Sequence, residues 1–352
     1  MARVVIPRRL RELAGGEREV EVEAATVRQV IEGLEAAYPG MKEKLYDFEA
    51  DQLKRGTAVI VDGETSQMGL LKKISAESEV HFLPAMGGGA DPIFSDAQAA
   101  YFDEHGYVHL GRVATCTQLT ALRQRIDDLM LGVIEVDGVT FQLDGGTGEY
   151  HGLSSHTDGP PRSTLSYRRV DELHNDPVFL TYMQQRLFRD ITRCYVGEDV
   201  SIFRSMFMNK PANQGTVLPW HQDVGAGWGI DTNPIATVWT ALDDATVDTG
   251  CMQIVPGSHR LGILNPGHYT SEEDQAAYCS EDKVIDLEVA EGEAVLIHNW
   301  MLHRSGVNHT DRPRRAFSVA YMDAATREVK SGKRFPVIFG ERALQPKLSA
   351  GV

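Results

Sequence analysis

Hydrophobic and polar residues alternate through much of the first quarter of the chain. Alternation at residues 2–6 and 19–24 predicts two short strands joined by a turn. Residues 26–40 then carry apolar side chains at helical spacing, between a threonine that can cap a helix and a Pro-Gly pair that can end one. Two more strands are predicted at residues 56–64 and 74–85. The predicted order is strand, strand, helix, strand, strand.

A glycine-rich stretch, MGGGADP, follows the last of these strands at residues 86–92 and predicts a linker. Beyond it the apolar spacing indicates helices that alternate with single strands or loops. The predicted elements before residue 200 are a helix from Ser95 to Gly106, a strand at 107–113, a helix at 117–130, long irregular loops at 134–168 and a helix at 176–196.

From about residue 200 the pattern changes to short apolar strands separated by turns. Pro-Gly and Asp-Asp pairs mark several of these turns. A series of such strands suggests a double-stranded β-helix, also called a jelly roll, which is mainly β with flanking helices. The predicted strands are 200–210, 217–223, 236–244, 251–258, 284–289, 294–302 and 314–322.

The composition is that of an ordinary globular protein. A length of 352 residues predicts two domains, and we place them at residues 1–89 and 90–352. The net charge of −15 argues against nucleic acid as a partner, because a phosphate backbone requires a basic face. The four cysteines form no C-x-x-C pair, and the chain shows no apolar signal segment or membrane-spanning run. We therefore expect a cytoplasmic protein.

Two polar residues interrupt one of the apolar strands. The stretch LPWHQDV places His221 and Asp223 two residues apart, so that both side chains should point to one face of the strand and Gln222 to the other. Facing a barrel interior, such groups are costly to bury without a partner. A metal ion would be that partner, and a simple hydrogen-bonded pair on a strand is the alternative.

A third metal ligand is available in the stretch AVLIHNWMLHRSGVNHT, which contains His298, His303 and His309. His303 is favoured because Ser305 and Arg314 follow it. Two imidazoles and one carboxylate on one face of a metal leave positions open for a cosubstrate and dioxygen. That arrangement suits non-haem Fe(II) better than a closed structural zinc site.

A cosubstrate such as 2-oxoglutarate chelates iron through its keto and C1 carboxylate oxygens, and its far carboxylate then needs a cation. Arg314 and Arg315 are the candidates, since an arginine can hold a carboxylate through two hydrogen bonds. Adjacent strand residues face opposite sides, so only one of them can reach the cosubstrate. The spacing from His303 favours Arg314, and Ser305 can donate a second hydrogen bond.

The motifs PWHQD, VWTALDDATVDTGCMQIVPGSH, LHRSGVNHT and RRAFSVAYM resemble the phytanoyl-CoA dioxygenase (PhyH) family of Fe(II)- and 2-oxoglutarate-dependent oxygenases. The resemblance covers residues 93–325, the core of the second domain. Carried over residue by residue, it implies iron ligands at His221, Asp223 and His303, contacts to the 2-oxoglutarate C5 carboxylate from Arg314 and Ser305, and packing of Trp239 near that cosubstrate.

The same resemblance implies the reaction. The expected enzyme is a dioxygenase that uses O2, hydroxylates an unactivated C–H bond of a small molecule in a biosynthetic pathway, and releases succinate and CO2. Asp223 favours hydroxylation over halogenation, because related halogenases replace the ligand carboxylate with a small residue.

The first domain resembles the β-grasp sulfur carriers of the MoaD and ThiS type over residues 1–89, through RLRELAGG, TVRQVIEGLEAAYPG, VIVDGE and VHFLPAMGGG. Such ubiquitin-like carriers act through a free C-terminal glycine carboxylate, whereas Gly87, Gly88 and Gly89 are followed here by the second domain. A module that docks a protein partner is therefore expected. The alternative is a sulfur-carrier precursor that is cut at Gly87–Gly89, with the oxygenase-like part as a scaffold.

Several residues on or beside the predicted site are candidates for contact with the substrate, although an ordinary structural role is the alternative for each. The glycine-rich loop VGAGWGID after Asp223 is a candidate lid. The candidate substrate residues are Arg204, Asn209, Gln253, Trp228 and His156.

Overall fold

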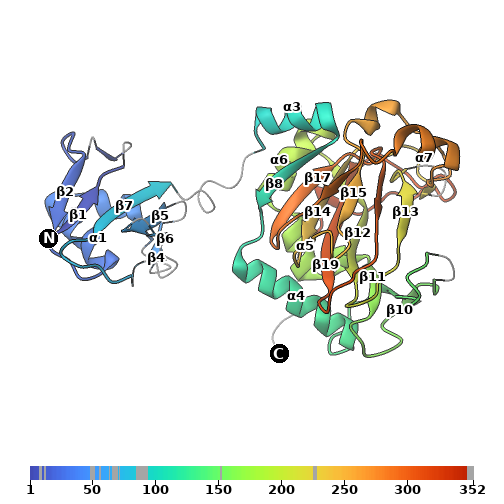
Figure 1. Cartoon of the computed structure of the whole chain (residues 1–352), viewed down its shortest axis with the longest axis horizontal. Helices are drawn as coiled ribbons and strands as arrows, with labels where there is room; N and C mark the ends of the chain where they lie inside the picture. Colours follow the sequence, from blue (N-terminus) through green and yellow to red (C-terminus); the bar gives the residue numbers. More distant parts are fainter. Residues whose placement is uncertain are drawn as a thin grey trace. The chain divides into compact units, whose positions relative to one another are not determined.

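The computed structural model describes residues 1–7, 10–11, 13–47, 52–54, 57–62, 64–65, 70, 72–84, 94–150, 153–224 and 228–346. The chain divides into two compact units, Met1–Pro92 and Ile93–Val352 (Figure 1). The run Gly87–Gly89 lies outside the described residues, as does part of the glycine-rich loop after Asp223. Among the described helices, none combines the length and the apolar character needed to cross a bilayer.

The first unit is a β-grasp fold, in which a mixed sheet packs against helix α1 (Val27–Ala37). The central strands β1 and β7 are parallel, and the other pairs are antiparallel. Thr26 caps α1 as expected, and the buried side chains of the helix join the apolar core of this unit. The sheet order is β2 (Glu19–Val22), β1 (Ala2–Val5), β7 (Glu79–Pro84), β5 (Thr57–Val61) and β6 (Glu64–Thr65), with α2 (Met41–Leu45) and the small pair β3 (Tyr46–Asp47) and β4 (Gln52–Leu53) beside it.

The second unit is built on a large, mostly antiparallel sheet. Its long central strands β12 and β19 pair from Val200 with Asp323 to Lys210 with Arg314. The sheet order is β10 (Thr157–Asp158), β9 (Thr140–Leu143), β11 (Tyr167–Asp171), β12 (Val200–Lys210), β19 (Arg314–Asp323), β14 (Ala236–Ala241), β17 (Glu293–Ile297) and β8 (Tyr107–Arg112), and β20 (Val337–Phe339) also pairs with β12.

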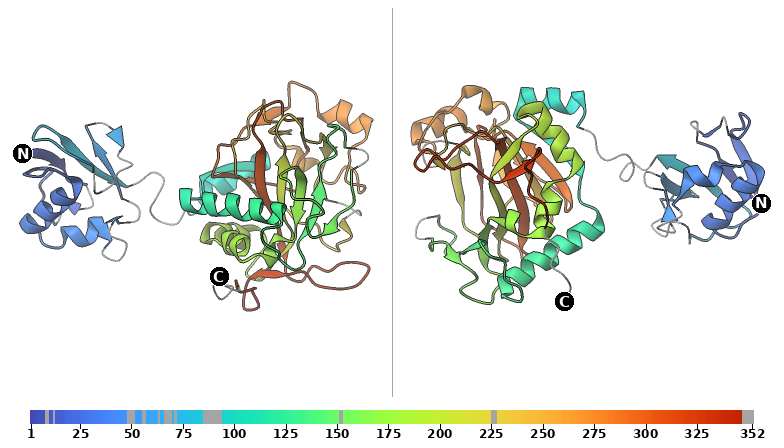
Figure 2. Two further views of the ribbon diagram at one scale, coloured as in Figure 1. Left: turned by 90° about the horizontal axis from the view of Figure 1, so that it is seen from below. Right: turned by 180° about the vertical axis from the view of Figure 1, so that it is seen from behind.

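Helices cover one face of this large sheet (Figure 2). Alternate strand residues such as Phe207, Val238 and Phe317 point to that face and form one continuous core with the apolar sides of the helices. The helices are α4 (Cys116–Leu131), α5 (Pro177–Met183) and α6 (Arg186–Tyr195), while α3 (Asp96–His105), with its Ser95 capping box and Gly106 stop, packs beside β8.

The other face of the large sheet is opposed by a smaller antiparallel sheet, and a second apolar core joins the two. Together the two sheets make the predicted double-stranded β-helix. The small sheet has the order β13 (Leu218–His221), β18 (His303–Ser305), β15 (Met252–Ile254) and β16 (Ile285–Leu287), and the helix α7 (Glu272–Tyr278) lies in the long connection between β15 and β16.

Two sequence expectations for the second unit were wrong. Residues 134–168 are not irregular throughout, because β9, β10 and the start of β11 extend the large sheet there through non-local pairing. The single helix expected at 176–196 is two helices that are separated at Gln184–Gln185, where the backbone leaves the helical conformation.

We predict that Asp176→Ala destabilises the second unit by about 3 kcal/mol, because removing one partner of a buried pair leaves an uncompensated charge. Asp176 is fully buried, accepts from the backbone N–H groups of Val178 and Phe179, and lies 2.6 Å from Nε of Arg125. Tryptophan fluorescence during urea unfolding measures the effect selectively, since all four tryptophans lie in the second unit. Asp128→Ala, which removes an exposed contact with Gln124, is the control and should change the midpoint little.

Candidate metal and cosubstrate site

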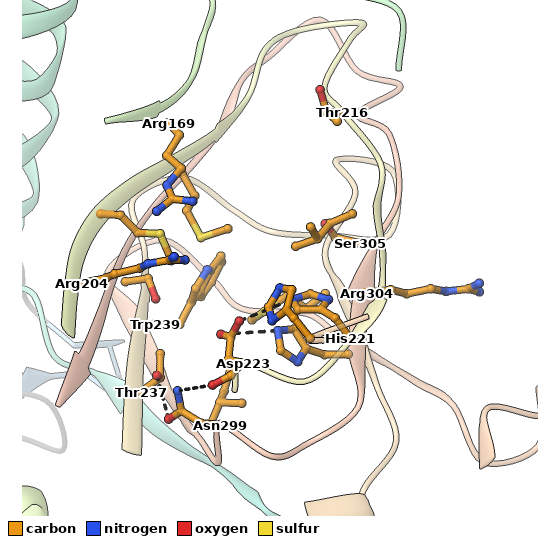
Figure 3. A pocket seen from close by; sticks show the side chains of 18 of the residues that line it. Arg169, Arg204, Thr216, His221, Asp223, Thr237, Trp239, Asn299, Arg304 and Ser305 are labelled. Atoms are coloured by element: carbon orange, nitrogen blue, oxygen red, sulfur yellow. Dashed lines mark hydrogen bonds and ion pairs between the residues drawn. The ribbon is translucent and has the colours of Figure 1, made fainter. Parts of the chain in front are cut away.

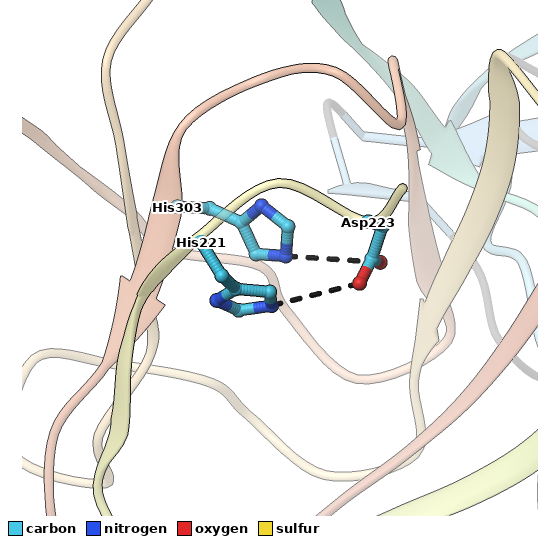
Figure 4. A group of neighbouring side chains, drawn as sticks. All are labelled: His221, Asp223 and His303. Carbon is cyan, nitrogen blue, oxygen red and sulfur yellow. Dashed lines mark ion pairs between the residues drawn. The ribbon is translucent and has the colours of Figure 1, made fainter. Parts of the chain in front are cut away.

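His221, Asp223 and His303 converge in the cavity between the two sheets (Figure 4). His221 and His303 are cross-strand partners at the ends of β13 and β18. Nε2 of His221 lies 3.6 Å from one carboxylate oxygen of Asp223, and Nε2 of His303 lies 3.8 Å from the other. The three residues thus offer three ligand atoms within 4.8 Å of one another.

Both imidazole rings are held by their other nitrogen. Nδ1 of His221 lies 2.8 Å from the carbonyl oxygen of Pro219, and Nδ1 of His303 lies 2.9 Å from that of Met301. A carbonyl only accepts, so each Nδ1 carries the proton and each Nε2 presents a lone pair toward Asp223. This is the orientation that metal-binding histidines need, and the donor set of two imidazoles and one carboxylate fits a non-haem Fe(II) ion.

The surroundings also favour the ionisation states that bind a metal. Burial lowers the pKa of His303 to about 4, so its imidazole is neutral at neutral pH. Burial by itself would raise the pKa of Asp223, but the neighbouring His221 and His303 outweigh it and hold that pKa well below its ordinary value. Asp223 is therefore an anion beside the neutral imidazole of His303.

The sequence argument for Asp223 needs one correction, since β13 ends at His221 and Asp223 follows in a bend. The bend is held through Gln222, which is buried and points away from the triad. Its amide donates to the carbonyls of Gly262 and Trp300 at 2.8 and 2.5 Å, and its carbonyl accepts from the N–H of Leu264 at 2.8 Å. Gln222 therefore ties three backbone segments together behind the triad.

Arg314 forms one end of the cavity and is completely buried. Its guanidinium lies 5.7 Å from the ring centroid of Trp239 and donates to the carbonyl of Gly250, while Nε has no hydrogen-bond partner among the described residues. Burial lowers the pKa of Arg314 only to about 10, so the side chain stays positive. Ser305 lines the same cavity from β18. A buried cation with an unused N–H is a ready site for a carboxylate.

Lys210 is a second buried cation at this end, although the sequence alone favours an ordinary role for it over a contact with substrate. It is the cross-strand partner of Arg314, and its ammonium donates to the carbonyl of Thr216 at 2.7 Å. Burial and the charge of Arg314 lower its pKa. Like charges directly opposite on neighbouring strands repel. The signal was available in the alternation of Arg204, Met206, Met208 and Lys210 along one face of β12.

The competing ligands and arginines have other roles. His298 stacks on Phe102, and its Nδ1 accepts from the N–H of Trp300, whereas the side chain of His309 is exposed. Arg315 points to the opposite side of β19 from Arg314, where it pairs with Asp243 and Asp127. The expected strand parity is thus observed, with Arg314 inside and Arg315 outside.

The candidate substrate residues separate into two groups. Arg204, Trp228 and Asn209 line the cavity of the triad, although the amide of Asn209 donates to the carbonyls of Leu165 and Tyr167. Two residues do not line it. Gln253 bonds to Asp286 and Arg304 on the exposed side of the small sheet, and His156 pairs with Asp171 in a neighbouring cavity.

Comparison of the sequence with known proteins identifies a family for each of the two units. Residues 102–316 match the family described as Phytanoyl-CoA dioxygenase (PhyH), and residues 4–89 match the ThiS family. A Caenorhabditis elegans protein named probable phytanoyl-CoA dioxygenase is 26% identical over 244 residues, covering 65% of this chain and 75% of that protein. A Stutzerimonas stutzeri protein named probable alpha-ketoglutarate-dependent hypophosphite dioxygenase is 25% identical over 242 residues, covering 66% of this chain and 79% of that protein.

Solved structures share the fold of the second unit. The crystal structure of EctD from S. alaskensis with bound Fe superposes with a TM-score of 0.53 at 21% identity, covering 69% of this chain and 82% of that one. The same protein with 2-oxoglutarate and 5-hydroxyectoine gives a TM-score of 0.52 at 19% identity, covering 74% and 89%. These likenesses establish the double-stranded β-helix.

We predict that Gln222→Met weakens metal binding about tenfold, because partners behind a metal site orient its ligands. Losing the three hydrogen bonds should also lower the free energy of unfolding by about 3 kcal/mol. Calorimetric titration with Co(II) and urea unfolding measure the two effects. Gln253→Met, which removes a surface contact, is the matched control. Unchanged Co(II) affinity in Gln222→Met would show that the bend holds without its side-chain anchor.

Proposed function

Because the chain belongs to the phytanoyl-CoA dioxygenase family of non-haem 2-oxoglutarate-dependent oxygenases, we propose that it hydroxylates an unactivated C–H bond of a small molecule. Fe(II) and 2-oxoglutarate are the proposed cofactor and cosubstrate, and the setting is a biosynthetic pathway. The observation that carries the proposal is the convergence of two Nε2 atoms and one carboxylate in a cavity that two buried cations also line.

His221, Asp223 and His303 would hold the iron. Their three donors lie to one side, which leaves positions for a chelating cosubstrate and for O2. When bound, iron and 2-oxoglutarate supply the oxidising chemistry, in which the cosubstrate loses CO2 and becomes succinate. The carboxylate of Asp223 occupies the place that a halide needs in related halogenases, and this supports hydroxylation over halogenation.

Arg314 and Lys210 would hold the far carboxylate of 2-oxoglutarate, with Ser305 as a further donor and Trp239 packed beside them. A dicarboxylate placed there would screen the repulsion between the two buried cations. The similarity to a protein named alpha-ketoglutarate-dependent dioxygenase supports this choice of cosubstrate.

The remaining wall of the cavity would orient the substrate and exclude water. Met206, Met208, Met252 and Ile297 line it with apolar surface. Its volume of about 320 Å³ lies at the small end of the range for ligand pockets, which suits a small substrate beside the cosubstrate.

We predict that anaerobic Fe(II) and 2-oxoglutarate produce the weak visible charge-transfer band of the chelated cosubstrate. Asp223→Ala should abolish the band. Arg314→Met and Lys210→Met should each raise the 2-oxoglutarate concentration for half-maximal absorbance about 30-fold, because each removes a buried charged partner worth about 2 kcal/mol. His309→Ala removes an exposed histidine and is the control. A full band in Asp223→Ala would refute the ligand assignment.

For the first unit we propose a docking role toward a protein partner. Two observations support this role. The unit matches the ThiS family, and it has an apolar core of its own, so that it can act as a separate recognition module. The alternative of a released sulfur carrier requires a free carboxylate at the Gly87–Gly89 run, which only cleavage of the chain provides.

We predict that the chain remains intact in its native host. Intact-mass spectrometry of the affinity-purified protein should show the full-length species, because an internal peptide bond cannot be activated as a carrier terminus. The matched control is a variant with Gly88 and Gly89 both changed to Ala, which should likewise give the full-length species at its own calculated mass. A fragment that ends at Gly89 and carries sulfur in place of one carboxylate oxygen would instead establish the sulfur-carrier function.

A further inference from the structure

The cavity of the metal triad carries a large excess of positive charge. Asp223 is the only carboxylate among the described residues that line the cavity. The protein as a whole, in contrast, has a net charge of −15. A ferrous ion and a 2-oxoglutarate dianion cancel one another, so the proposed cofactors leave this excess unchanged. The cationic residues of the lining are Arg168, Arg169, Arg204, Lys210, Arg304 and Arg314, of which Arg304 directs its charged group away from the cavity toward Gln253.

Arg204 is the cation in this set that most clearly lacks a partner. It extends from β12 into the cavity near Trp239 and Asp223 (Figure 3). Its guanidinium carbon lies 4.8 Å from the ring centroids of both Phe203 and Trp228. Within the described residues, these ring contacts are the interactions it makes, and no hydrogen bond or ion pair holds its N–H groups. Burial lowers the pKa of Arg204 to about 10, and the side chain remains a cation at neutral pH.

Asp171, Glu172 and Asp223 act on Arg204 through their charge, but none of them forms an ion pair with it among the described residues. Asp171 accepts from Nε and Nη2 of Arg169 at 2.9 and 2.6 Å, and His156 lies 3.1 Å from its other oxygen. Asp223 belongs to the proposed metal site. Arg204 and Arg169 both point into the same part of the cavity (Figure 3), and the charge of each opposes that of the other. Arg204 therefore presents to a ligand N–H donors that no described protein group uses.

This charge is separate from the proposed cosubstrate end. Arg204 and Lys210 lie six positions apart on one face of β12 with Met206 and Met208 between them. At the rise of a β-strand, that separation is about 20 Å. When Arg314 and Lys210 hold the far carboxylate of 2-oxoglutarate, that group lies at the other end of this strand face from Arg204, which leaves Arg204 available for a different anion.

Resting on the proposed function, we propose that Arg204, with Arg169 beside it, binds an oxyanionic group of the primary substrate next to the metal triad. The substrate class is then a small organic acid that carries a carboxylate or a phosphonate. The planar guanidinium can take either group through two parallel N–H donors. Trp228 and His268 line the same part of the cavity and would pack against the rest of the molecule.

The thermal stability of an Arg204 variant distinguishes a ligand-binding role of this side chain from a structural role. Arg204→Met keeps an apolar stem against Trp228 and removes a charge that forms no ion pair within the described residues. The ligand-free variant should therefore unfold at a temperature equal to or above that of the wild type, since an unpaired buried charge destabilises the folded state. A clear decrease would show that Arg204 is a structural residue and would overturn the proposal. Arg304→Met is the matched control, since Arg304 points away from the cavity in Figure 3 and bonds to Gln253.

Ligand binding tests the substrate class. The full-length protein is loaded with Ni(II) and 2-oxoglutarate, so that the cosubstrate end is filled and no turnover occurs. Calorimetric titrations then compare benzoate with benzamide, butyrate with butyramide, and phenylphosphonate as a tetrahedral oxyanion. At least one acid should bind tenfold or more tightly than its neutral counterpart, and Arg204→Met should abolish that difference while Arg304→Met retains it. Preference for benzoate and butyrate would assign a carboxylate substrate, and preference for phenylphosphonate would assign a phosphonate.

The outcomes distinguish this proposal from the proposed function. If Ni(II) and 2-oxoglutarate bind but no acid outcompetes its amide, the anion subsite is wrong and the oxygenase site stands. If neither Ni(II) nor 2-oxoglutarate binds, the same titrations on metal-free protein still decide whether Arg204 selects acids. Equal acid binding by wild type and Arg204→Met overturns the proposal in either case.

Discussion

Buried charge is the constraint that organises the second unit. A double-stranded β-helix packs apolar side chains between its two sheets. In this protein the space between the sheets also holds the charged side chains of Asp223, Lys210 and Arg314. Such groups destabilise an interior unless a partner is supplied. Among the described residues no acid forms an ion pair with either cation, and the carboxylate lies beside two imidazoles. The interior therefore has the charge pattern of a site whose partners come from solution, namely a divalent cation and at least one organic anion.

The paired strands β12 and β19 determine where along the cavity each of these ligands from solution would bind. Their inward positions run from Arg204 through two methionines to Lys210 and Arg314, and the triad faces them from the smaller sheet and the bend after β13. Helices packed on the outer face bury that side of the strand pair in an apolar core. The large apolar core thus does more than stabilise the unit, because it holds cationic groups at opposite ends of one rigid surface.

Much of the site could be predicted from the sequence, because its key residues are tied to strand parity and local motifs. His221 and His303 face one another as expected, and Arg314 and Arg315 separate to opposite faces of one strand. Parity does not say which sheet face is internal, so Gln253 looked as suitable as Arg204. The strands within 134–168 and the positions of Arg168 and Arg169 escaped detection, since they depend on pairing with distant segments rather than on local periodicity.

A comparison of the adjacent residues Arg314 and Arg315 shows that the unpaired charges of the cavity do not result from a lack of acidic residues in the chain. Arg315 is held by two aspartates on the helical side of the sheet, and Arg123 and Arg125 are paired there as well. The next residue in the chain, Arg314, is buried without any acid. A chain with 50 acidic residues and 35 basic ones could easily neutralise its interior. Asp127 and Asp243 instead pair with Arg315 on the outer face, which leaves Arg314 on the inner face available for a ligand.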